Sequence, residues 1–175
     1  MPQTAAHLLL VLSVLVVPTL RADSADPLAN PKIDAGSFLE LTLAATAARE
    51  QRRLSEAEFL AAAAEPGTVV LDARSRDKFE QLHVRGAVSL PFTDFTAESL
   101  AAVVPDPQTR ILIYCNNNFA GAEEPFPTKA PPAALNLSTY VALWTYGYRN
   151  VDELGPLVDV EHTRLDLVAG RAPGS

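Results

Sequence analysis

Short apolar runs along the chain predict strands of a buried sheet. Thr68–Leu71 and Arg110–Tyr114 are brief, continuous and rich in aliphatic side chains, and Ala87–Leu90 is a similar run that is closed by a proline. Continuous runs of this kind are typical of parallel strands, because helices cover both faces of a parallel sheet. Asn150–Glu153 is predicted to be a last, shorter strand.

The segments between these runs have helical patterns. The clearest helix start is the capping box from Ser55 to Glu58, with Leu54 and Phe59 as its hydrophobic staple. Thr96 is positioned to cap a second helix, and Gly147 to end another in the left-handed conformation. The predicted helices are 37–52, 56–64, a short one ending at Gln81, 97–103 and 133–146.

Strands that alternate with helices predict an α/β fold with a parallel sheet and helices on both faces. The strand Arg110–Tyr114 ends directly before Cys115, the only cysteine of the chain. In open parallel sheets, ligands bind at the carboxyl ends of strands. Cys115 is therefore a candidate for the chemistry of this protein.

The first residues predict a targeting segment. Leu8–Val17 is apolar apart from Ser13, Pro18 interrupts it, and Ala22 offers a small residue for cleavage. The run is too short to span a bilayer, so we expect a signal peptide over 1–22, with an uncleaved anchor as the alternative. The expected location is periplasmic or extracellular. Residues 23–52 are expected to be a linker and an accessory helix outside or at the edge of the main domain.

The charge and the histidines exclude several classes of partner. The net charge of −7 argues against nucleic acid, which requires a basic surface. The three histidines are scattered, so neither a metal nor a cofactor is expected. The single cysteine also excludes an internal disulfide. In an oxidising compartment such a thiol is expected to be buried, paired between chains or used chemically.

The residues after Cys115 favour a reactive thiol. Asn116, Asn117 and Asn118 tolerate turn conformations, and a loop that leads into a helix directs backbone N–H groups toward the sulfur. The other interpretation is a polar turn that is merely solvated. The stretch 116–132 holds several prolines and is predicted to lack regular structure.

Several motifs together resemble the rhodanese-like domain. They are the strand that ends in Asp72-Ala-Arg74-Ser, the later Phe79, the segment from His83 through Gly86 to Pro91, the strand Ile-Leu-Ile-Tyr before Cys115, and Gly147-Tyr-Arg-Asn-Val151. The resemblance covers about residues 53–155 and leaves 156–175 as a C-terminal tail. It implies a sheet of about five parallel strands.

The resemblance also implies roles for individual residues. Cys115 matches the cysteine that carries sulfane sulfur as a persulfide, between a small donor and a thiol acceptor. Asp72 and Arg74 match a pair that supports the active-site loop. His83 matches a structural histidine, and Asn116, Asn117, Asn118 and Phe119 fall in the substrate-binding loop.

The loop after Cys115 departs from the family pattern. The family's loop is short and usually contains an arginine, whereas no arginine lies between Arg110 and Arg149 here, and Lys129 is the only basic residue of 116–132. The sixth position after Cys115 is Gly121, which argues against the related phosphatases. The longer loop either forms a lid with Phe119 and Phe126 as its apolar lining, or covers a retired site.

Three functions stay open at this point. The first is an exported sulfurtransferase or persulfide carrier. The second is a catalytically inactive rhodanese-like module that binds an unidentified protein partner, and the third is another thiol reaction through a sulfenic acid. The aromatic residues Tyr140, Trp144, Tyr146 and Tyr148 are expected to pack in the core rather than to bind a ligand.

Overall fold

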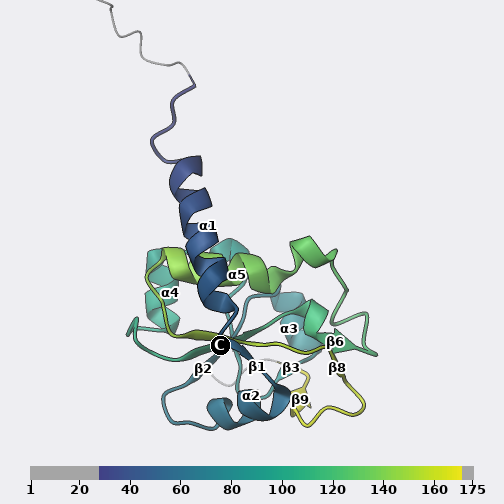
Figure 1. The fold of residues 1–175 in the computed structure, drawn as a ribbon. Helices are drawn as coiled ribbons and strands as arrows, with labels where there is room; N and C mark the ends of the chain where they lie inside the picture. Colours follow the sequence, from purple (N-terminus) through teal and green to yellow (C-terminus); the bar gives the residue numbers. More distant parts are fainter. Residues whose placement is uncertain (1–27, 171–175) are drawn as a thin grey trace, which may run out of the picture. The chain divides into compact units, whose positions relative to one another are not determined.

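The helices begin where the sequence offers side chains that cap them. The structure is a computed structural model of the chain and describes residues 28–170 (Figure 1). At α2 (Glu56–Ala63), the Ser55 hydroxyl accepts from the Glu58 N–H group, and the Glu58 carboxylate accepts from the Ser55 N–H group at 2.8 Å. Thr96 and Ser99 form the same reciprocal pair at α4 (Ala97–Val103). Both predicted helix starts are confirmed.

The remaining elements follow the predicted alternation of strands and helices. The other α-helices are α1 (Ala35–Arg49), α3 (Arg76–Gln81) and α5 (Leu135–Thr145). The short 3-10 helices are η1 (Phe92–Asp94), η2 (Asn116–Asn118) and η3 (Pro131–Ala133). The strands are β1 (Arg53–Leu54), β2 (Val69–Asp72), β3 (His83–Val84), β4 (Val88–Ser89), β5 (Ile111–Tyr114), β6 (Phe119–Ala120), β7 (Val151–Leu154), β8 (Val158–Asp159) and β9 (Leu167–Val168).

Five of these strands form one parallel sheet in the order β1–β7–β5–β2–β4. The central strand β5 pairs with β2 on one side and with β7 on the other, so that Ile113 lies opposite both Leu71 and Glu153. The carboxyl ends of β2, β5 and β7 therefore meet at one edge. The expectation of a five-stranded parallel sheet with helices is confirmed.

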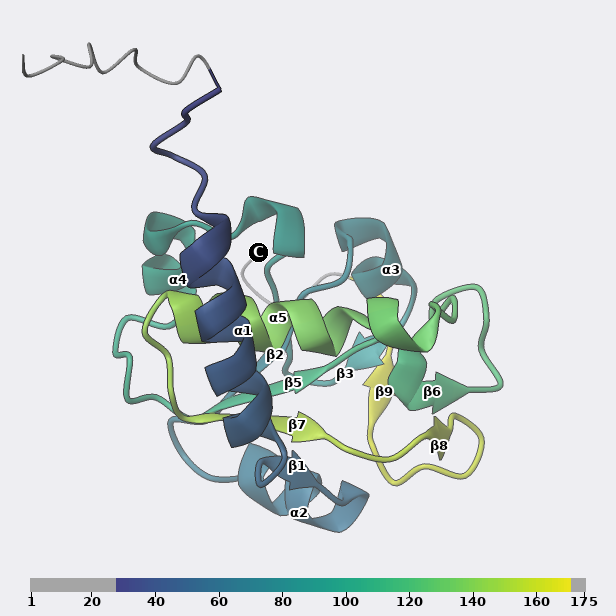
Figure 2. The same cartoon turned by 45° about the horizontal axis from the view of Figure 1, so that its top comes forward.

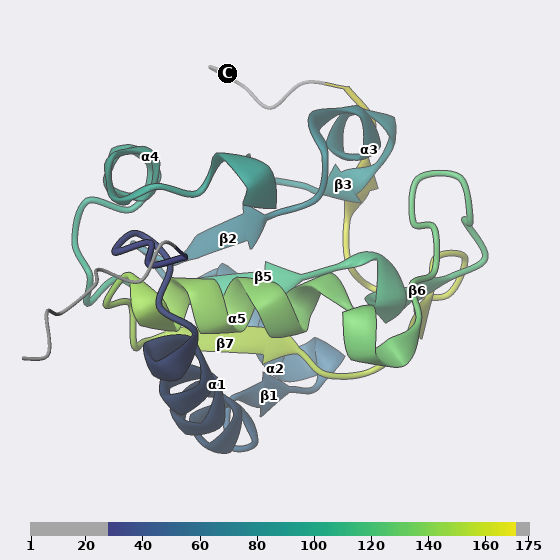
Figure 3. The same ribbon diagram turned by 90° about the horizontal axis from the view of Figure 1, so that it is seen from above.

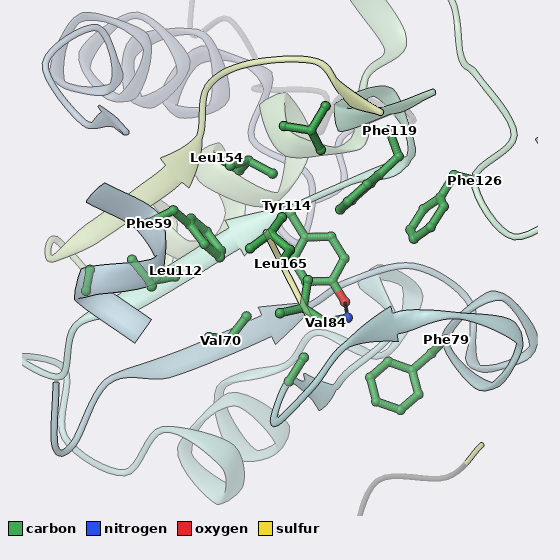
Figure 4. Close-up of a cluster of buried hydrophobic side chains, with 13 residues drawn as sticks. Phe59, Val70, Phe79, Val84, Leu112, Tyr114, Phe119, Phe126, Leu154 and Leu165 are labelled. Atoms are coloured by element: carbon green, nitrogen blue, oxygen red, sulfur yellow. Dashed lines mark hydrogen bonds between the residues drawn. The ribbon is translucent and has the colours of Figure 1, made fainter. Parts of the chain in front are cut away.

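The residues of the sheet alternate between two hydrophobic layers. Leu112 and Tyr114 of β5 pack in a cluster with Phe59 of α2 and Phe79 of α3. Ile111 and Ile113 belong to a second cluster, which includes side chains from α1, α4 and α5. Figures 2 and 3 show α1 and α5 together on one face and α2 on the other, and Figure 4 shows the first cluster.

Helix α1 is longer at its start and more closely packed than the sequence suggests. The Asp34 carboxylate caps it by accepting from the Ser37 N–H group at 2.9 Å. Ala45 is fully buried in the cluster that contains Tyr140 and Leu143 of α5. The helix, which was expected outside or at the edge of the main domain, contributes to one of the two layers.

Two segments that the sequence predicts to be irregular contain paired strands. The prediction for the stretch 116–132 was wrong in this respect, because β6 pairs in parallel with β8. Farther along, β9 pairs antiparallel with β3. Val158 and Leu165 are buried, although they lie beyond the last predicted strand. Strands of two residues have no periodicity of their own, so only their partners define them.

The chain divides into two units, 1–33 and 34–175. Of the first unit the structure describes 28–33, a turn in which the Ile33 N–H group donates to the Asn30 carbonyl at 3.0 Å. The predicted signal peptide over 1–22 lies outside the described residues. No helix between residues 28 and 170 has both the length and the apolar character that crossing a membrane requires.

Candidate functional site around Cys115

Cys115 lies directly after β5, at the edge where the carboxyl ends of the strands meet. The residue is 2% exposed. The Asn118 side chain holds its backbone, because Asn118 Oδ1 accepts from the Cys115 N–H group at 2.9 Å. Asn118 Nδ2 donates to the carbonyls of Leu154 at 2.7 Å and Pro156 at 3.2 Å. One side chain thus ties the cysteine to the end of the neighbouring strand β7.

Backbone N–H groups from two segments converge on the Cys115 sulfur. Asn117 supplies one from η2, and Leu135 and Asn136 supply two from the first turn of α5. Ala134, which precedes α5, cannot cap it with a side chain, so these N–H groups stay directed at the sulfur. The amides and the positive end of the helix dipole stabilise an anionic sulfur.

Burial has the larger effect on the thiol. It raises the pKa of Cys115 above the usual range, while the N–H groups of Asn136 and Asn117 lower it in part and the Glu153 carboxylate raises it further. The resting side chain is therefore a thiol at neutral pH, and the thiolate forms as the pH rises.

A pocket of about 170 Å³ adjoins the thiol. Arg49 of α1 and Glu153 of β7 line it together with Cys115. The Arg49 guanidinium binds the Glu153 carboxylate through two hydrogen bonds, Nε to Oε2 at 2.9 Å and Nη2 to Oε1 at 2.5 Å. The Glu153 side chain is 2% exposed and that of Arg49 is 17% exposed. The pocket thus contains a cation that is held at a fixed position beside the sulfur.

Arg49 is absent from the residues that were predicted from the sequence. A cation near Cys115 was expected only in the loop that follows it. Arg49 lies far upstream, in a helix that was expected to be accessory. One signal is nevertheless present: Arg49 follows the apolar position Ala45 by four residues and so lies on the same helix face. A cation next to a buried face suggests a buried anionic partner.

Asp72 and Arg74 form a second ion pair, which is completely buried. Arg74 Nη2 lies 2.5 Å from Asp72 Oδ2, and Nε lies 3.0 Å from Oδ1. The same guanidinium donates to the carbonyls of Leu82 at 2.7 Å and Pro125 at 2.9 Å. Because Pro125 belongs to the long loop, Arg74 connects that loop to the end of β2. Neither member of the pair lines the pocket beside Cys115.

The four predicted loop residues occupy different environments. Asn117 and Asn118 line the pocket, and Asn117 also exchanges two hydrogen bonds with the backbone of Lys129. Asn116 is buried outside the pocket lining. Phe119 stacks on Phe126 with ring centroids 4.1 Å apart, and both belong to the hydrophobic cluster of Figure 4. Of the two interpretations of the loop, the one in which these rings line the pocket does not agree with the structure.

His83 contacts its own segment. Its Nδ1 atom lies 2.8 Å from the Phe79 carbonyl, and its ring stacks on that of Phe79 at 3.8 Å. The next turn contains Gly86 at a positive φ of 83°, a conformation that favours glycine. The side chain is buried away from the pocket at Cys115.

The sequence model of the rhodanese-like domain matches residues 55–153, more than half of the chain. The chain belongs to the rhodanese-like domain family. A search among curated proteins finds no significant match.

One solved structure with a TM-score above 0.5 shares the fold of this rhodanese-like chain. A thiosulfate sulfurtransferase from Pseudomonas aeruginosa superposes with a TM-score of 0.51 and 20% identity, over 75% of this chain and 23% of that protein. A rhodanese with anions from E. coli has a TM-score of 0.41 and 24% identity, over 59% of this chain and 99% of that chain. These levels of identity establish the fold alone.

Within this rhodanese-like domain, hydrogen bonds inside the long loop and to Arg74 hold the loop in place. The Asn117–Lys129 exchange joins the two arms of the loop, and Arg74 holds it at Pro125. The loop supplies no arginine to the pocket, so the guanidinium beside Cys115 comes from α1 instead.

Proposed function

We propose that this chain is an exported sulfurtransferase or persulfide carrier in which Cys115 holds the transferred sulfur. The observation that carries the proposal is the set of backbone N–H groups, from Asn117, Leu135 and Asn136, that face the Cys115 sulfur and lower the pKa of its thiol. They stabilise a thiolate during attack on a sulfur donor. The pocket beside the thiol provides room for one additional sulfur atom.

The proposed reaction transfers sulfane sulfur without net oxidation. The Cys115 thiolate attacks the terminal sulfur of a donor such as thiosulfate, and a new S–S bond forms at Sγ. The bond between that sulfur and the rest of the donor breaks, and sulfite leaves with the electron pair. An acceptor thiolate then attacks the outer sulfur, which returns Cys115 as a thiolate.

The pocket also suggests how an anionic donor is bound. Arg49 supplies the positive charge that the loop lacks, while Glu153 neutralises part of it. Because the pKa of Cys115 is raised, sulfur uptake should accelerate as the pH rises through the titration of the thiol. A donor that binds at Arg49 competes with Glu153 for the guanidinium.

Export rests on the apolar run Leu8–Val17 with its break at Pro18. A single cysteine that is buried is also compatible with an oxidising compartment. If the signal peptide is removed, the protein recovered from the periplasmic or extracellular fraction begins at Asp23. A recovered chain that still begins at Met1 would contradict cleavage.

The alternative is a catalytically inactive rhodanese-like binding module. Two observations favour it: Cys115 is only 2% exposed, and the pKa of its thiol is raised. An inert thiol inside the folded domain is what this alternative expects, and its partner would be a protein.

The deciding experiment measures sulfur on Cys115. The full chain is incubated with thiosulfate, polysulfide or a thiosulfonate across a range of pH values, and the mass of the Cys115 peptide is recorded before and after reduction. The proposal expects the gain of one sulfur atom, removed by reductant, in the wild type and not in Cys115→Ser. A folded protein that gains no sulfur from any donor, and whose thiol resists alkylation, would support the binding module.

A further inference from the structure

A second, larger cavity lies between helices α1 and α5. This groove has a volume of about 660 Å³ and mainly apolar walls. The walls include Phe38 of α1, Phe92 of η1, Val141 of α5, and Tyr146, which directly follows α5. Figure 2 shows α1 running across α5 in front of the sheet. A volume of this size is typical of pockets for small molecules.

The groove contains buried polar atoms that the described residues leave unpaired. Tyr140 is 1% exposed, and its hydroxyl has no hydrogen-bond partner among residues 28–170. The Thr42 hydroxyl is in the same situation. Both residues line the groove. Because a buried hydroxyl without a partner is unfavourable, two of them in one apolar groove point to a ligand that supplies acceptors.

The groove adjoins the pocket beside Cys115. Arg49 and Leu137 line both cavities, and the adjacent residues Pro131 and Pro132 line one each. From Leu137 to Tyr146 the groove follows about 13 Å of helix α5. A molecule that extends from the groove past Arg49 into the smaller pocket would have one end at the thiol and the other between apolar side chains.

We infer that the α1–α5 groove binds the apolar group of an organic thiosulfonate, R–SO₂–S⁻, which donates its terminal sulfur to Cys115. The inference rests on the proposed sulfur transfer and names the class of donor. The anionic head lies at Arg49, and Tyr140 donates a hydrogen bond to a sulfonyl oxygen. Thiosulfate has the same terminal sulfur but no group that would fill the groove.

The chemistry of the step is balanced. The Cys115 thiolate attacks the terminal sulfur of R–SO₂–S⁻, and the bond between the two donor sulfurs breaks. The sulfinate R–SO₂⁻ leaves with the electron pair, and Cys115 becomes a persulfide anion. The apolar group stays bound in the groove until the sulfinate dissociates.

The test compares benzenethiosulfonate with methanethiosulfonate, which share one head and differ in their apolar group. Each rate of persulfide formation on Cys115 is divided by the rate of the same reagent with free cysteine at equal pH, which removes the difference in intrinsic reactivity. The corrected rate should be at least about tenfold higher for benzenethiosulfonate, since burial of a phenyl group is worth that much or more.

The matched variants are Thr46→Trp and Ala47→Trp. Both residues are exposed positions of α1, but only Thr46 lines the groove, so only its tryptophan fills it. We expect Thr46→Trp to abolish the preference for benzenethiosulfonate and Ala47→Trp to retain it. Circular dichroism and thermal unfolding establish that both variants are folded.

The second measurement tests binding in the groove without sulfur transfer. Octane-1-sulfonate carries an apolar chain and an anionic head but no transferable sulfur. Calorimetry should show binding to the full-length wild type and to Ala47→Trp, and a loss of about tenfold or more in affinity in Thr46→Trp. Unchanged affinity in Thr46→Trp would overturn the inference.

The failure of this inference is distinguishable from the failure of the proposed function. If Cys115 gains sulfur from both thiosulfonates at equal corrected rates, the inference is overturned and the sulfur transfer remains. If Cys115 gains sulfur from no donor, the proposed function is overturned, and with it the assignment of the groove to a sulfur donor.

Discussion

Two buried arginine–carboxylate pairs lie near the carboxyl edge of the sheet and differ in what surrounds them. Arg74 and Asp72 are enclosed completely, and the guanidinium also bonds the carbonyls of Leu82 and Pro125. Arg49 and Glu153 have equally short contacts, but they line the pocket of Cys115 and leave part of the guanidinium accessible. The first pair has its donors directed at protein atoms, whereas the second retains capacity for a ligand.

This difference distinguishes an ion pair that supports the fold from an ion pair that can bind a ligand. A buried charge whose hydrogen bonds are all made within the protein fixes the surrounding backbone, and its removal leaves an uncompensated partner. When the carboxylate partner borders a cavity, the guanidinium exchanges that partner for a bound anion at a smaller cost in free energy. Similar pairs of residues therefore serve different purposes, and the surroundings of each pair show which one it is.

The largest expected effect is that of Arg74→Met. The substitution leaves the Asp72 carboxylate buried without a cation and removes the donors to Leu82 and Pro125. We expect the free energy of unfolding to fall by about 3–5 kcal/mol, the usual cost of breaking a buried ion pair on one side. Urea denaturation followed by circular dichroism measures it.

The control for this substitution is Arg85→Met. Arg85 pairs with Asp166 at 2.5 Å, but both side chains are well exposed, at 65% and 61%. Solvent screens such a pair, so the expected loss is much smaller than that for Arg74→Met. Equal losses in the two variants would show that the enclosure of Arg74 contributes nothing.

A smaller effect is expected for Tyr114→Phe. The Tyr114 hydroxyl donates to Asp72 Oδ2 at 2.5 Å and accepts from the Val84 N–H group at 3.2 Å. Its loss leaves Asp72 with Arg74, so we expect a decrease of about 2 kcal/mol in the free energy of unfolding. The alkylation rate of Cys115 should not change in the folded variant. A change in that rate would mean that the first pair acts on the thiol after all.

The smallest effect is expected for Glu153→Gln, and it is specific to the Arg49–Glu153 pair. The Glu153 carboxylate raises the pKa of Cys115, so its neutralisation favours the thiolate and moves the titration of the thiol to lower pH. Alkylation of Cys115 at neutral pH should accelerate severalfold. The measurement is the iodoacetamide rate against pH.

Glu123→Gln provides the matched control for this pH profile. Glu123 is an exposed residue of the long loop and does not line the pocket. Its neutralisation makes the net charge of the chain less negative by the same amount but should leave the titration of Cys115 in place. A profile that moves to higher pH in Glu153→Gln would contradict the role assigned to that carboxylate.

The sequence was sufficient for the parts of the fold whose signals are local. The capping boxes at Ser55 and Thr96 and the aliphatic runs of β2 and β5 depend on neighbouring residues, and all four are confirmed. The strands β6, β8 and β9 depend on partners distant in the chain. No local pattern marks a strand of two residues, so these pairings were missed.

The same distinction between local signals and distant contacts applies to the candidate site. The position of Cys115 after a buried strand follows from the aliphatic run that precedes it. The contribution of Arg49 depends on how α1 packs against α5, which the weak periodicity of an alanine-rich helix does not specify. One interpretation of the loop placed the rings of Phe119 and Phe126 in the pocket because they lie in the loop. Their large apolar area favours burial in the core instead.

The edge strand β1 pairs with β7, a segment that the ribosome makes about a hundred residues later, with Arg53 opposite Glu153 and Leu54 opposite Leu154. Chain synthesis is vectorial, so β1 stays unpaired until nearly the whole domain has emerged. Contacts of such long range slow folding. A nascent chain of this topology thus leaves one edge of its sheet incomplete until the segment Val151–Leu154 has been synthesised.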